Sequence, residues 1–206
     1  MKETLESLAR RVKACRICVE TPLRRPLPHA PRPVFQASAT ARLLIASQAP
    51  GKRVHASGRP FTDPSGIRLR QWLGIDETLF YDEHRVAIVP MGMCFPGQDD
   101  QGSDLPPRPE CAPAWRAKLL AHLSAVELVL CVGRPAQLWH MGDLAGADLT
   151  HGVRNWRQAY ALKPRILPLP HPSWRNNAWL KRNPWFAHEL LPVLRQGIAG
   201  LFAEHA

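Results

Sequence analysis

No stretch of the sequence is long and apolar enough to cross a membrane. A spanning helix needs about 18 or more consecutive apolar residues, and the 206-residue chain contains no such run. The N-terminal residues, MKETLESLARRVKACRIC, have neither the apolar segment nor the small-residue cleavage site of an export signal. We therefore expect a cytoplasmic protein, of the cytosol or nucleoid, that has no membrane partner.

Linkers rich in serine or glycine are also missing. A chain of 206 residues can bury the core of one domain, and no shift of composition divides it. The one biased segment is TPLRRPLPHAPRPVFQASAT, residues 21–40, whose five prolines exclude a long helix or a central strand. We expect a single domain over residues 1–206 that acts as a monomer. A short helix over residues 3–14 and this proline-rich arm would form its first part, residues 1–40.

Acidic residues are scarce in this chain. The sequence has 17 Asp and Glu against 27 Lys and Arg, a net charge of +10. A solvated basic surface would have the same composition. However, residues 174–186, WRNNAWLKRNPWF, interleave tryptophan with cations, and aromatic faces beside phosphate-binding cations suit nucleic acid. The sequence therefore favours a nucleic-acid partner.

Apolar runs and helical patterns alternate along the chain. The runs predict strands at residues 42–47, 86–91, 127–133 and 165–170, and the patterns predict helices at residues 64–75, 108–123, 134–142 and 184–200. Such alternation predicts an α/β fold with a mostly parallel sheet. Ligands of these sheets bind beyond the carboxyl ends of the strands. The segments at those ends are SQAPG (47–51), GMCFPGQ (92–98) and PHPSWRN (170–176).

Four of the five cysteines suit a shared metal site. Cys15 and Cys18 form a C-x-x-C pair, which follows a helix instead of opening one and so does not resemble a redox pair. Cys94 and Cys111 lie in loops with proline or glycine, where thiolates can turn toward a common centre. Zinc sites usually contain a second C-x-x-C pair, so this spacing favours an iron–sulfur cluster without excluding zinc. Cys131 lies inside a predicted strand and is expected to be a buried, inert thiol.

These motifs together resemble the uracil-DNA glycosylase superfamily, particularly its family 4 iron–sulfur members. The resemblance runs from Cys15 to about Arg175 and rests on the order SQAPG, GRPF (58–61), MCFPG (93–97) and HPS (171–173), with the cysteines at compatible spacing. It implies a three-layer αβα sandwich around a four-stranded, mostly parallel sheet. It also implies a structural [4Fe-4S] cluster that ties the arm to the loops, with structural zinc as the alternative, on Cys15, Cys18, Cys94 and Cys111.

The resemblance also implies roles for individual residues. His171 would donate a hydrogen bond to the departing base, and Phe61 would stack on a base flipped out of the DNA. The backbone N–H groups of Gln48 and Ala49 would bind a base carbonyl, with Ser173 also on the substrate side. Contacts to DNA are expected from Lys52, Arg53, Arg59, Trp174 and Arg175.

The sequence departs from the family pattern in its acids. The family's carboxylates at positions 48 and 55 are absent, and so is its base-reading asparagine before Cys94. Neutral His55 would accept a proton from water, whereas protonated His55 would oppose a cationic sugar. Asp63 is the nearest acid, although an Asp before Pro-Ser-Gly also suits a helix N-cap or a turn. His55 and Asp63 are therefore the candidates to activate water.

Three functions remain at this point. The first is a DNA glycosylase of base-excision repair that hydrolyses the N-glycosidic bond of uracil or another deaminated base. The alternative is a non-catalytic iron–sulfur protein that binds single-stranded or damaged DNA, which the missing acids favour. A hydrolase of free nucleotides is disfavoured by the net charge of +10 and by the tryptophan-rich segment.

Overall fold

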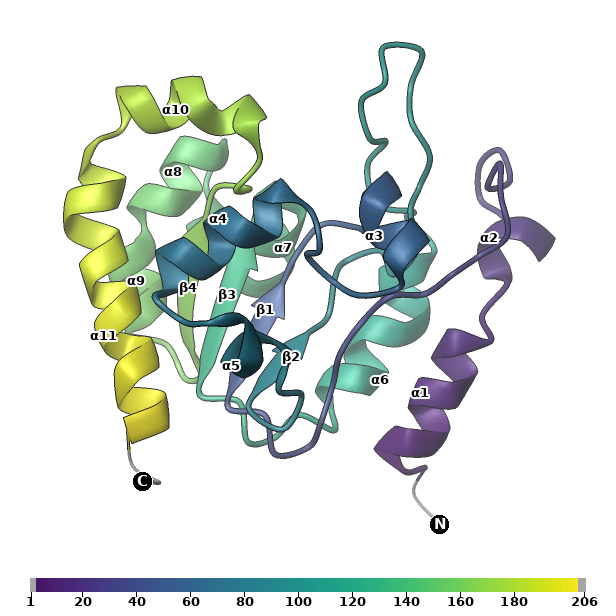
Figure 1. Ribbon diagram of the computed structural model, residues 1–206, viewed down its shortest axis with the longest axis horizontal. Coiled ribbons are helices and arrows are strands. Elements are labelled where there is room, and N and C mark those ends of the chain that lie inside the picture. Colours follow the sequence, from purple (N-terminus) through teal and green to yellow (C-terminus); the bar gives the residue numbers. More distant parts are fainter. Residues whose placement is uncertain (1–2, 204–206) are drawn as a thin grey trace.

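A four-stranded parallel sheet forms the centre of the molecule (Figure 1). The computed structural model describes residues 3–203. The strand order is β2-β1-β3-β4, and every neighbouring pair is parallel. This confirms the predicted α/β fold and the four predicted strand positions. The strands are β1 (Leu43–Ala46), β2 (Val86–Ile88), β3 (Leu128–Val132) and β4 (Arg165–Leu169).

Helices cover both faces of the sheet. Successive strand residues point to opposite faces, so Leu43 packs in one apolar cluster with Leu69 and Leu194, whereas Leu44 packs in another with Leu119. The first cluster joins the sheet to α4 (Pro64–Leu73) and α11 (Leu191–Phe202), and the second joins it to α1 (Leu5–Lys13) and α6 (Ala117–Leu120). This gives the three layers of an αβα sandwich. Nearly all strand residues are buried, and for this reason the strands are continuous apolar runs in the sequence.

The helices are short, and several join end to end. They are α1 (Leu5–Lys13), α2 (Ile17–Glu20), α3 (Lys52–Ser57), α4 (Pro64–Leu73), α5 (Glu77–Tyr81), α6 (Ala117–Leu120), α7 (Arg134–Met141), α8 (Leu149–Arg154), α9 (Trp156–Tyr160), α10 (Asn177–Arg182) and α11 (Leu191–Phe202). Shorter helical turns are η1 (Ala112–Arg116), η2 (Gly142–Ala145), η3 (Trp174–Asn176) and η4 (Phe186–Leu190). Over residues 3–203, none of them combines the length and apolarity needed to cross a membrane.

Helix α3 lies in residues 48–58, a segment for which the sequence patterns predicted no helix. Gly58 ends the helix with a left-handed backbone conformation (φ 71°), which glycine adopts without strain. The guanidinium of Arg32, in the proline-rich arm, donates hydrogen bonds to the carbonyls of His55 (2.8 Å) and Ala56 (2.7 Å). A partner this distant in sequence stabilises a helix that local patterns do not reveal.

The proline-rich arm lies along the edge of the sheet at β2. Gln36 forms an antiparallel bridge with Ile88, and its side-chain amide donates to the carbonyl of Val86 (2.7 Å). The backbone N–H of Val34 donates to the carbonyl of Met93 (2.7 Å). The arm therefore covers an edge that would otherwise expose unpaired backbone groups.

Candidate functional site

A cavity of about 900 Å³ opens at the carboxyl ends of the strands. Its walls come from the segments after β1, around the start of α4, within residues 96–106, and after β4. This is the position that a parallel α/β sheet provides for a ligand, and the volume lies in the usual range of binding pockets. We call this cavity the cleft.

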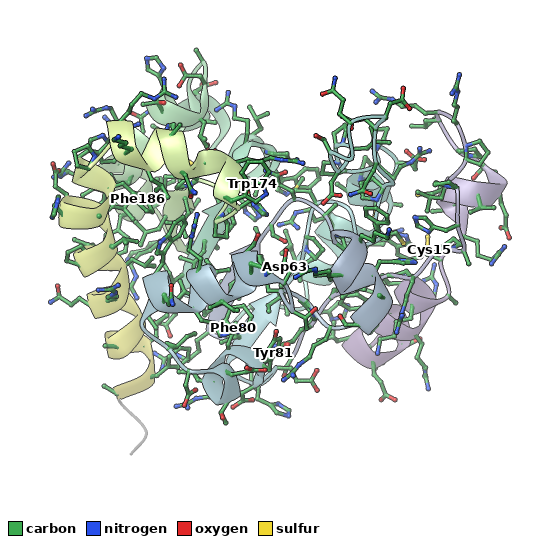
Figure 2. The ribbon with its side chains drawn as sticks, turned by 45° about the horizontal axis from the view of Figure 1, so that its top comes forward. Cys15, Asp63, Phe80, Tyr81, Trp174 and Phe186 are labelled. Atoms are coloured by element: carbon green, nitrogen blue, oxygen red, sulfur yellow. The ribbon has the colours of Figure 1, made fainter. Side chains whose placement is uncertain are left out.

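The cleft gathers most of the residues that the sequence singled out. In Figure 2, Asp63 and Trp174 lie together near the middle of the molecule, far from Cys15 at its side. Two predicted residues, His55 and Arg59, are not part of the lining. The predicted residues that do line the cleft are Gln48, Ala49, Lys52, Arg53, Phe61, Asp63, His171, Ser173, Trp174 and Arg175.

His171 follows β4 and reaches the cleft as a half-buried imidazole. Burial lowers its pKa below the usual value, Arg175 acts in the same direction, and the carboxylates of Asp63 and Asp104 partly oppose both. The ring is therefore mostly neutral at pH 7. The amide of Asn176 donates to the backbone carbonyl of His171 (2.7 Å), which fixes the turn that carries it. A neutral imidazole can donate a hydrogen bond to an anion without adding positive charge beside a cationic sugar.

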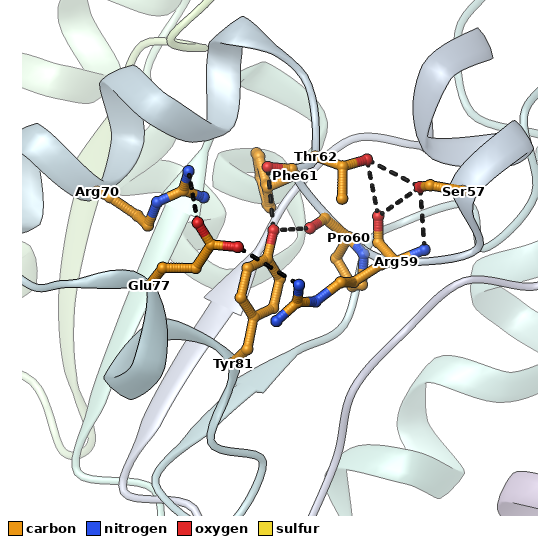
Figure 3. A network of polar contacts seen from close by, with 8 residues as sticks. All are labelled: Ser57, Arg59, Pro60, Phe61, Thr62, Arg70, Glu77 and Tyr81. Atoms are coloured by element: carbon orange, nitrogen blue, oxygen red, sulfur yellow. Dashed lines mark hydrogen bonds and ion pairs between the residues drawn. The ribbon is translucent and has the colours of Figure 1, made fainter.

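Phe61 is held in the cleft wall by an unusual backbone conformation. It is the one non-glycine residue with a positive φ (54°) among residues 3–203, and its side chain is buried. The hydroxyl of Tyr81 donates to the carbonyls of Pro60 (2.8 Å) and Phe61 (3.2 Å), as Figure 3 shows. A bulky residue in this conformation is strained, and such strain concentrates at functional sites. The ring is thereby fixed as a flat wall.

Arg59 lies in the network of Figure 3 and not in the cleft. Its guanidinium is 3.4 Å from the ring centroid of Tyr81 and 3.4 Å from a carboxylate oxygen of Glu77. The expectation that Arg59 faces a DNA phosphate finds no support in this position. The observed contacts brace Tyr81, which in turn supports Phe61.

His55 is directed toward the arm. Its ring centroid lies 4.4 Å from that of His29 and 5.9 Å from that of Phe95. Burial lowers the pKa of His55, and His29 and Arg32 lower it further. Because residues 52–57 form a helix and not an open loop, this imidazole does not reach the cleft. His55 is therefore poorly placed to activate water.

Asp63 has the structural role that its sequence context allowed, and it also lines the cleft. One carboxylate oxygen caps α4 by accepting a hydrogen bond from the backbone N–H of Gly66 (3.2 Å). The same carboxylate acts on His171. Asp63 thus lines the cleft while one of its carboxylate oxygens is used to cap α4.

Positive charge and an exposed indole border the cleft. Lys52 and Arg53 are exposed in the first turn of α3. In the segment after β4, Trp174 is 72% exposed, and the guanidinium of Arg175 lies 5.7 Å from its ring centroid. Cations that flank a protruding aromatic ring suit a phosphate backbone with an unstacked base.

Some cleft residues gave no signal in the sequence. Arg68 of α4 donates to the carbonyl of Ser173 (3.2 Å) and to the side chain of Asn177 (2.8 Å), so it joins two walls. Gln98 and Asp104 enter from the segment between the two later cysteines. The long spacing between Cys94 and Cys111 was the available hint that this segment extends away from the cysteines and returns.

The four predicted ligand cysteines surround a second, apolar pocket. We call it the cysteine pocket; it is lined by Val12, Cys15, Ile17, Cys18, Pro31, Pro33, Met93, Cys94, Cys111 and Trp115. The backbone N–H of Met93 donates to the sulfur of Cys111 (3.3 Å), and the indole of Trp115 donates to that of Cys15 (3.1 Å). Within residues 3–203, no three Cys, His, Asp or Glu side chains converge closely enough for a single metal ion. Cys131 is buried in β3, outside this pocket.

Comparison with known families agrees with this architecture. A family model described as the uracil DNA glycosylase superfamily matches residues 34–195. The match supports a glycosylase-type function with DNA as the partner, and it spans far more than half of the chain. The protein therefore belongs to the uracil-DNA glycosylase superfamily.

Proposed function

We propose that the protein is a DNA glycosylase of base-excision repair that hydrolyses the N-glycosidic bond of uracil or another deaminated base. The observation that carries this proposal is that neutral His171 and the fixed ring of Phe61 line the same cleft at the carboxyl ends of the strands. The pair supplies a hydrogen-bond donor and a stacking surface for one flipped base. Flipping costs a few kcal/mol, which contacts in the pocket offset.

Bond cleavage places opposite charges on the two fragments. As the C1′–N bond breaks, the base carries the electron pair and the sugar becomes cationic. His171 donates a hydrogen bond to the base and stabilises its negative charge. In other enzymes, removing one hydrogen-bond donor to a developing anion slows the reaction about 10²- to 10³-fold. Backbone N–H groups of Gln48 and Ala49 provide further donors beside the base.

Single or double strands of DNA approach from the side that Trp174 borders. Lys52, Arg53 and Arg175 contact phosphates, and the Trp174 ring stacks in the gap that the flipped base leaves. Phosphate contacts make binding salt-dependent, because bound cations are released from DNA. Phosphate contacts and stacking do not depend on which base is flipped, so the residues of the cleft determine which base is recognised.

The cysteine pocket suits a structural [4Fe-4S] cluster. The four cysteines line one apolar pocket, and two of their sulfurs accept N–H hydrogen bonds. A cluster needs ligands spread around a larger volume than a single zinc ion does. When bound, the cluster supplies structural cross-links and no step of base release. Arg116 adds support, because this buried cation pairs with no carboxylate among the described residues and follows Cys111 in the same helical segment. A thiolate-ligated cluster would bring negative charge near it.

The competing function is a non-catalytic protein that binds single-stranded or damaged DNA. Its support is the absence of a carboxylate in residues 48–58, together with the orientation of His55 away from the cleft. Gln48 stands at the position of one family acid, and its side chain packs against Gly133. This alternative predicts salt-dependent binding without base release.

A substrate panel separates the two functions. Oligonucleotides that carry uracil, hypoxanthine, xanthine or an alkylated base, in single and double strands, are incubated with the protein and analysed for free base and abasic sites. A glycosylase releases at least one base and loses that activity in His171→Ala. Binding to these oligonucleotides without any released base would favour the competing function.

A further inference from the structure

The segment between Cys94 and Cys111 forms an ordered hairpin beside the cleft. Gln98 and Asp104 pair across it in an antiparallel bridge, and the backbone N–H of Leu105 donates to the carbonyl of Gly97 (2.9 Å). Asp99 closes the tip by accepting hydrogen bonds from the backbone N–H groups of Gln101 (3.0 Å) and Ser103 (2.7 Å). In Figure 1 this is the teal loop that projects beyond α3. We call it the hairpin, residues 97–105.

Asp104 directs a carboxylate from this hairpin into the cleft. Asp104 is exposed; its Oδ1 accepts a hydrogen bond from the amide of Gln98 (3.1 Å), while Oδ2 has no hydrogen-bond partner among the described residues. That free oxygen lies against the loop after β1, because a Cβ atom added to Gly51 would be only 3.0 Å from it. The carboxylate also acts on His171 from the same cavity.

A carboxylate at this position is unfavourable for DNA binding. The protein carries a net charge of +10, and its cleft is bordered by cations that suit a polyanion. An acid at this place opposes phosphate binding, so DNA affinity gives no reason for it. A cationic sugar within the cleft does give a reason.

We propose that Asp104 is the carboxylate that faces the sugar of the flipped nucleotide and accepts the proton of the attacking water. The inference rests on the proposed glycosylase function and supplies the acid that residues 48–58 lack. The C1′–N bond breaks with its electron pair on the base, and the water oxygen bonds to C1′. The proton of that water passes to Asp104 and then to the base or to solvent. The products are the free base and an abasic sugar with a hydroxyl on C1′.

Asp104 suits this role better than Asp63 does. Asp63 uses one oxygen to cap α4, so moving or protonating it weakens a helix terminus. Asp104 also keeps one oxygen free, but its held oxygen accepts from the side chain of Gln98 and caps no helix, so protonating it leaves every helix terminus intact. A carboxylate with one oxygen held and the other open is oriented for proton transfer.

The test compares Asp104→Asn with Asp100→Asn. Asparagine keeps the shape of Asp104 and an acceptor for Gln98, so a purely structural role of this residue would survive the change. Asp100 lies on the same hairpin, is exposed, makes no hydrogen bond or ion pair among the described residues and does not line the cleft, so its variant removes the same charge elsewhere. Asp104→Glu keeps the charge and should retain part of the activity.

We expect Asp104→Asn to release base about 10²-fold more slowly in single turnovers, the usual contribution of a general base, while Asp100→Asn remains at the wild-type rate. A second readout uses DNA with a protonated pyrrolidine or a neutral tetrahydrofuran in place of the target sugar. Wild-type protein and Asp100→Asn should prefer the cationic analogue, and Asp104→Asn should lose that preference.

The outcomes distinguish this inference from the function on which it rests. If the wild-type protein releases base and Asp104→Asn matches Asp100→Asn in both assays, Asp104 is not the acid, although the glycosylase function stands. If the wild-type protein releases no base from any oligonucleotide of the panel, the function and this inference both fail.

Discussion

The cleft and the cysteine pocket are two cavities with opposite designs. The cleft is wide, lined by polar and apolar groups alike, and built from segments at the carboxyl ends of parallel strands. The cysteine pocket is lined almost wholly by apolar groups and sulfur, and its walls come largely from the arm, α1 and the loops around Cys94 and Cys111. The first arrangement suits a polar ligand from solvent, whereas the second suits the structural cluster proposed above.

The hairpin connects the two cavities. It begins three residues after Cys94 and ends six residues before Cys111, so both of its ends are close to the cysteine pocket while Asp104 reaches the cleft. The difference between the cavities therefore suggests a division of labour. Under the proposed function, the cysteine pocket would hold the hairpin in place and the cleft would carry out the chemistry.

Replacing His171 should give the largest effect, and only in the cleft. His171→Ala removes the donor to the leaving base and should slow base release about 10²- to 10³-fold. Iron content and the free energy of unfolding should stay close to those of the wild-type protein. Single-turnover assays and iron analysis check both parts, and full activity in this variant would exclude the assigned role.

Replacing a cysteine should instead affect both cavities. Cys111→Ser should remove the visible absorbance and the iron and sulfide of anaerobically purified protein, and it should weaken base release because the hairpin loses an anchor. Cys131→Ala is the matched control, since Cys131 is a buried cysteine outside the pocket and its variant should keep the iron. Colourless wild-type protein with stoichiometric zinc would reject the cluster.

Acid should destabilise the buried contacts between Arg116 and His140. Arg116 donates to the carbonyls of Val89 (2.6 Å) and Pro90 (3.1 Å) and contacts Nε2 of His140 (2.5 Å). Burial, and secondarily Arg116, lowers the pKa of His140 to about 3. The unfolded chain therefore binds a proton that the folded protein does not, and stability is lost as the pH falls from about 6.5 toward 3, by up to about 1.4 kcal/mol per pH unit.

The variant His140→Gln isolates this effect, because glutamine keeps an acceptor for Arg116 and does not titrate. Urea unfolding at a series of pH values should give a shallower decline for the variant in this window. Identical slopes for the two proteins would show that His140 is not responsible.

Removing the hydroxyl of Tyr81 should give the smallest effect. Tyr81→Phe deprives the carbonyls of Pro60 and Phe61 of a donor, which should cost about 1–3 kcal/mol of stability. It should also reduce base release modestly, because Phe61 is less firmly held. Tyr160→Phe is the control, since the Tyr160 hydroxyl contacts Arg165 and does not line the cleft. Equal loss of activity in both variants would show that the Tyr81 hydroxyl does not act through the position of Phe61.

The sequence predicted the sheet well for a physical reason. Strands buried on both faces are continuous apolar runs, and such runs mark all four strands here. The apolar run at residues 86–91 extends beyond β2, which ends at Ile88. The residues after β2 still lie beside β1, because the backbone N–H groups of Val89 and Met91 donate to the carbonyls of Ile45 and Ser47. Once the strands were located, the segments at their carboxyl ends could be predicted to form the site, and His171 lies in one of them.

The rest depends on contacts between distant segments. Helix α3 needs Arg32 of the arm, and its formation turns His55 away from the cleft. Asp104 reaches the cleft only because the hairpin folds back beside Gly51. Neither arrangement leaves a local pattern, so the sequence did not indicate that His55 lies outside the cleft lining or that Asp104 belongs to it. The family 4 subgroup, the single-domain boundaries and the monomeric state stay predictions.

The most direct test of the central claim is base release from the oligonucleotide panel by wild-type protein and His171→Ala, measured as abasic sites after a single turnover. Wild-type protein should produce abasic sites in at least one uracil- or other deaminated-base oligonucleotide, and His171→Ala should produce them about 10²- to 10³-fold more slowly. Salt-dependent binding of these oligonucleotides with no abasic sites from either protein would contradict the central claim.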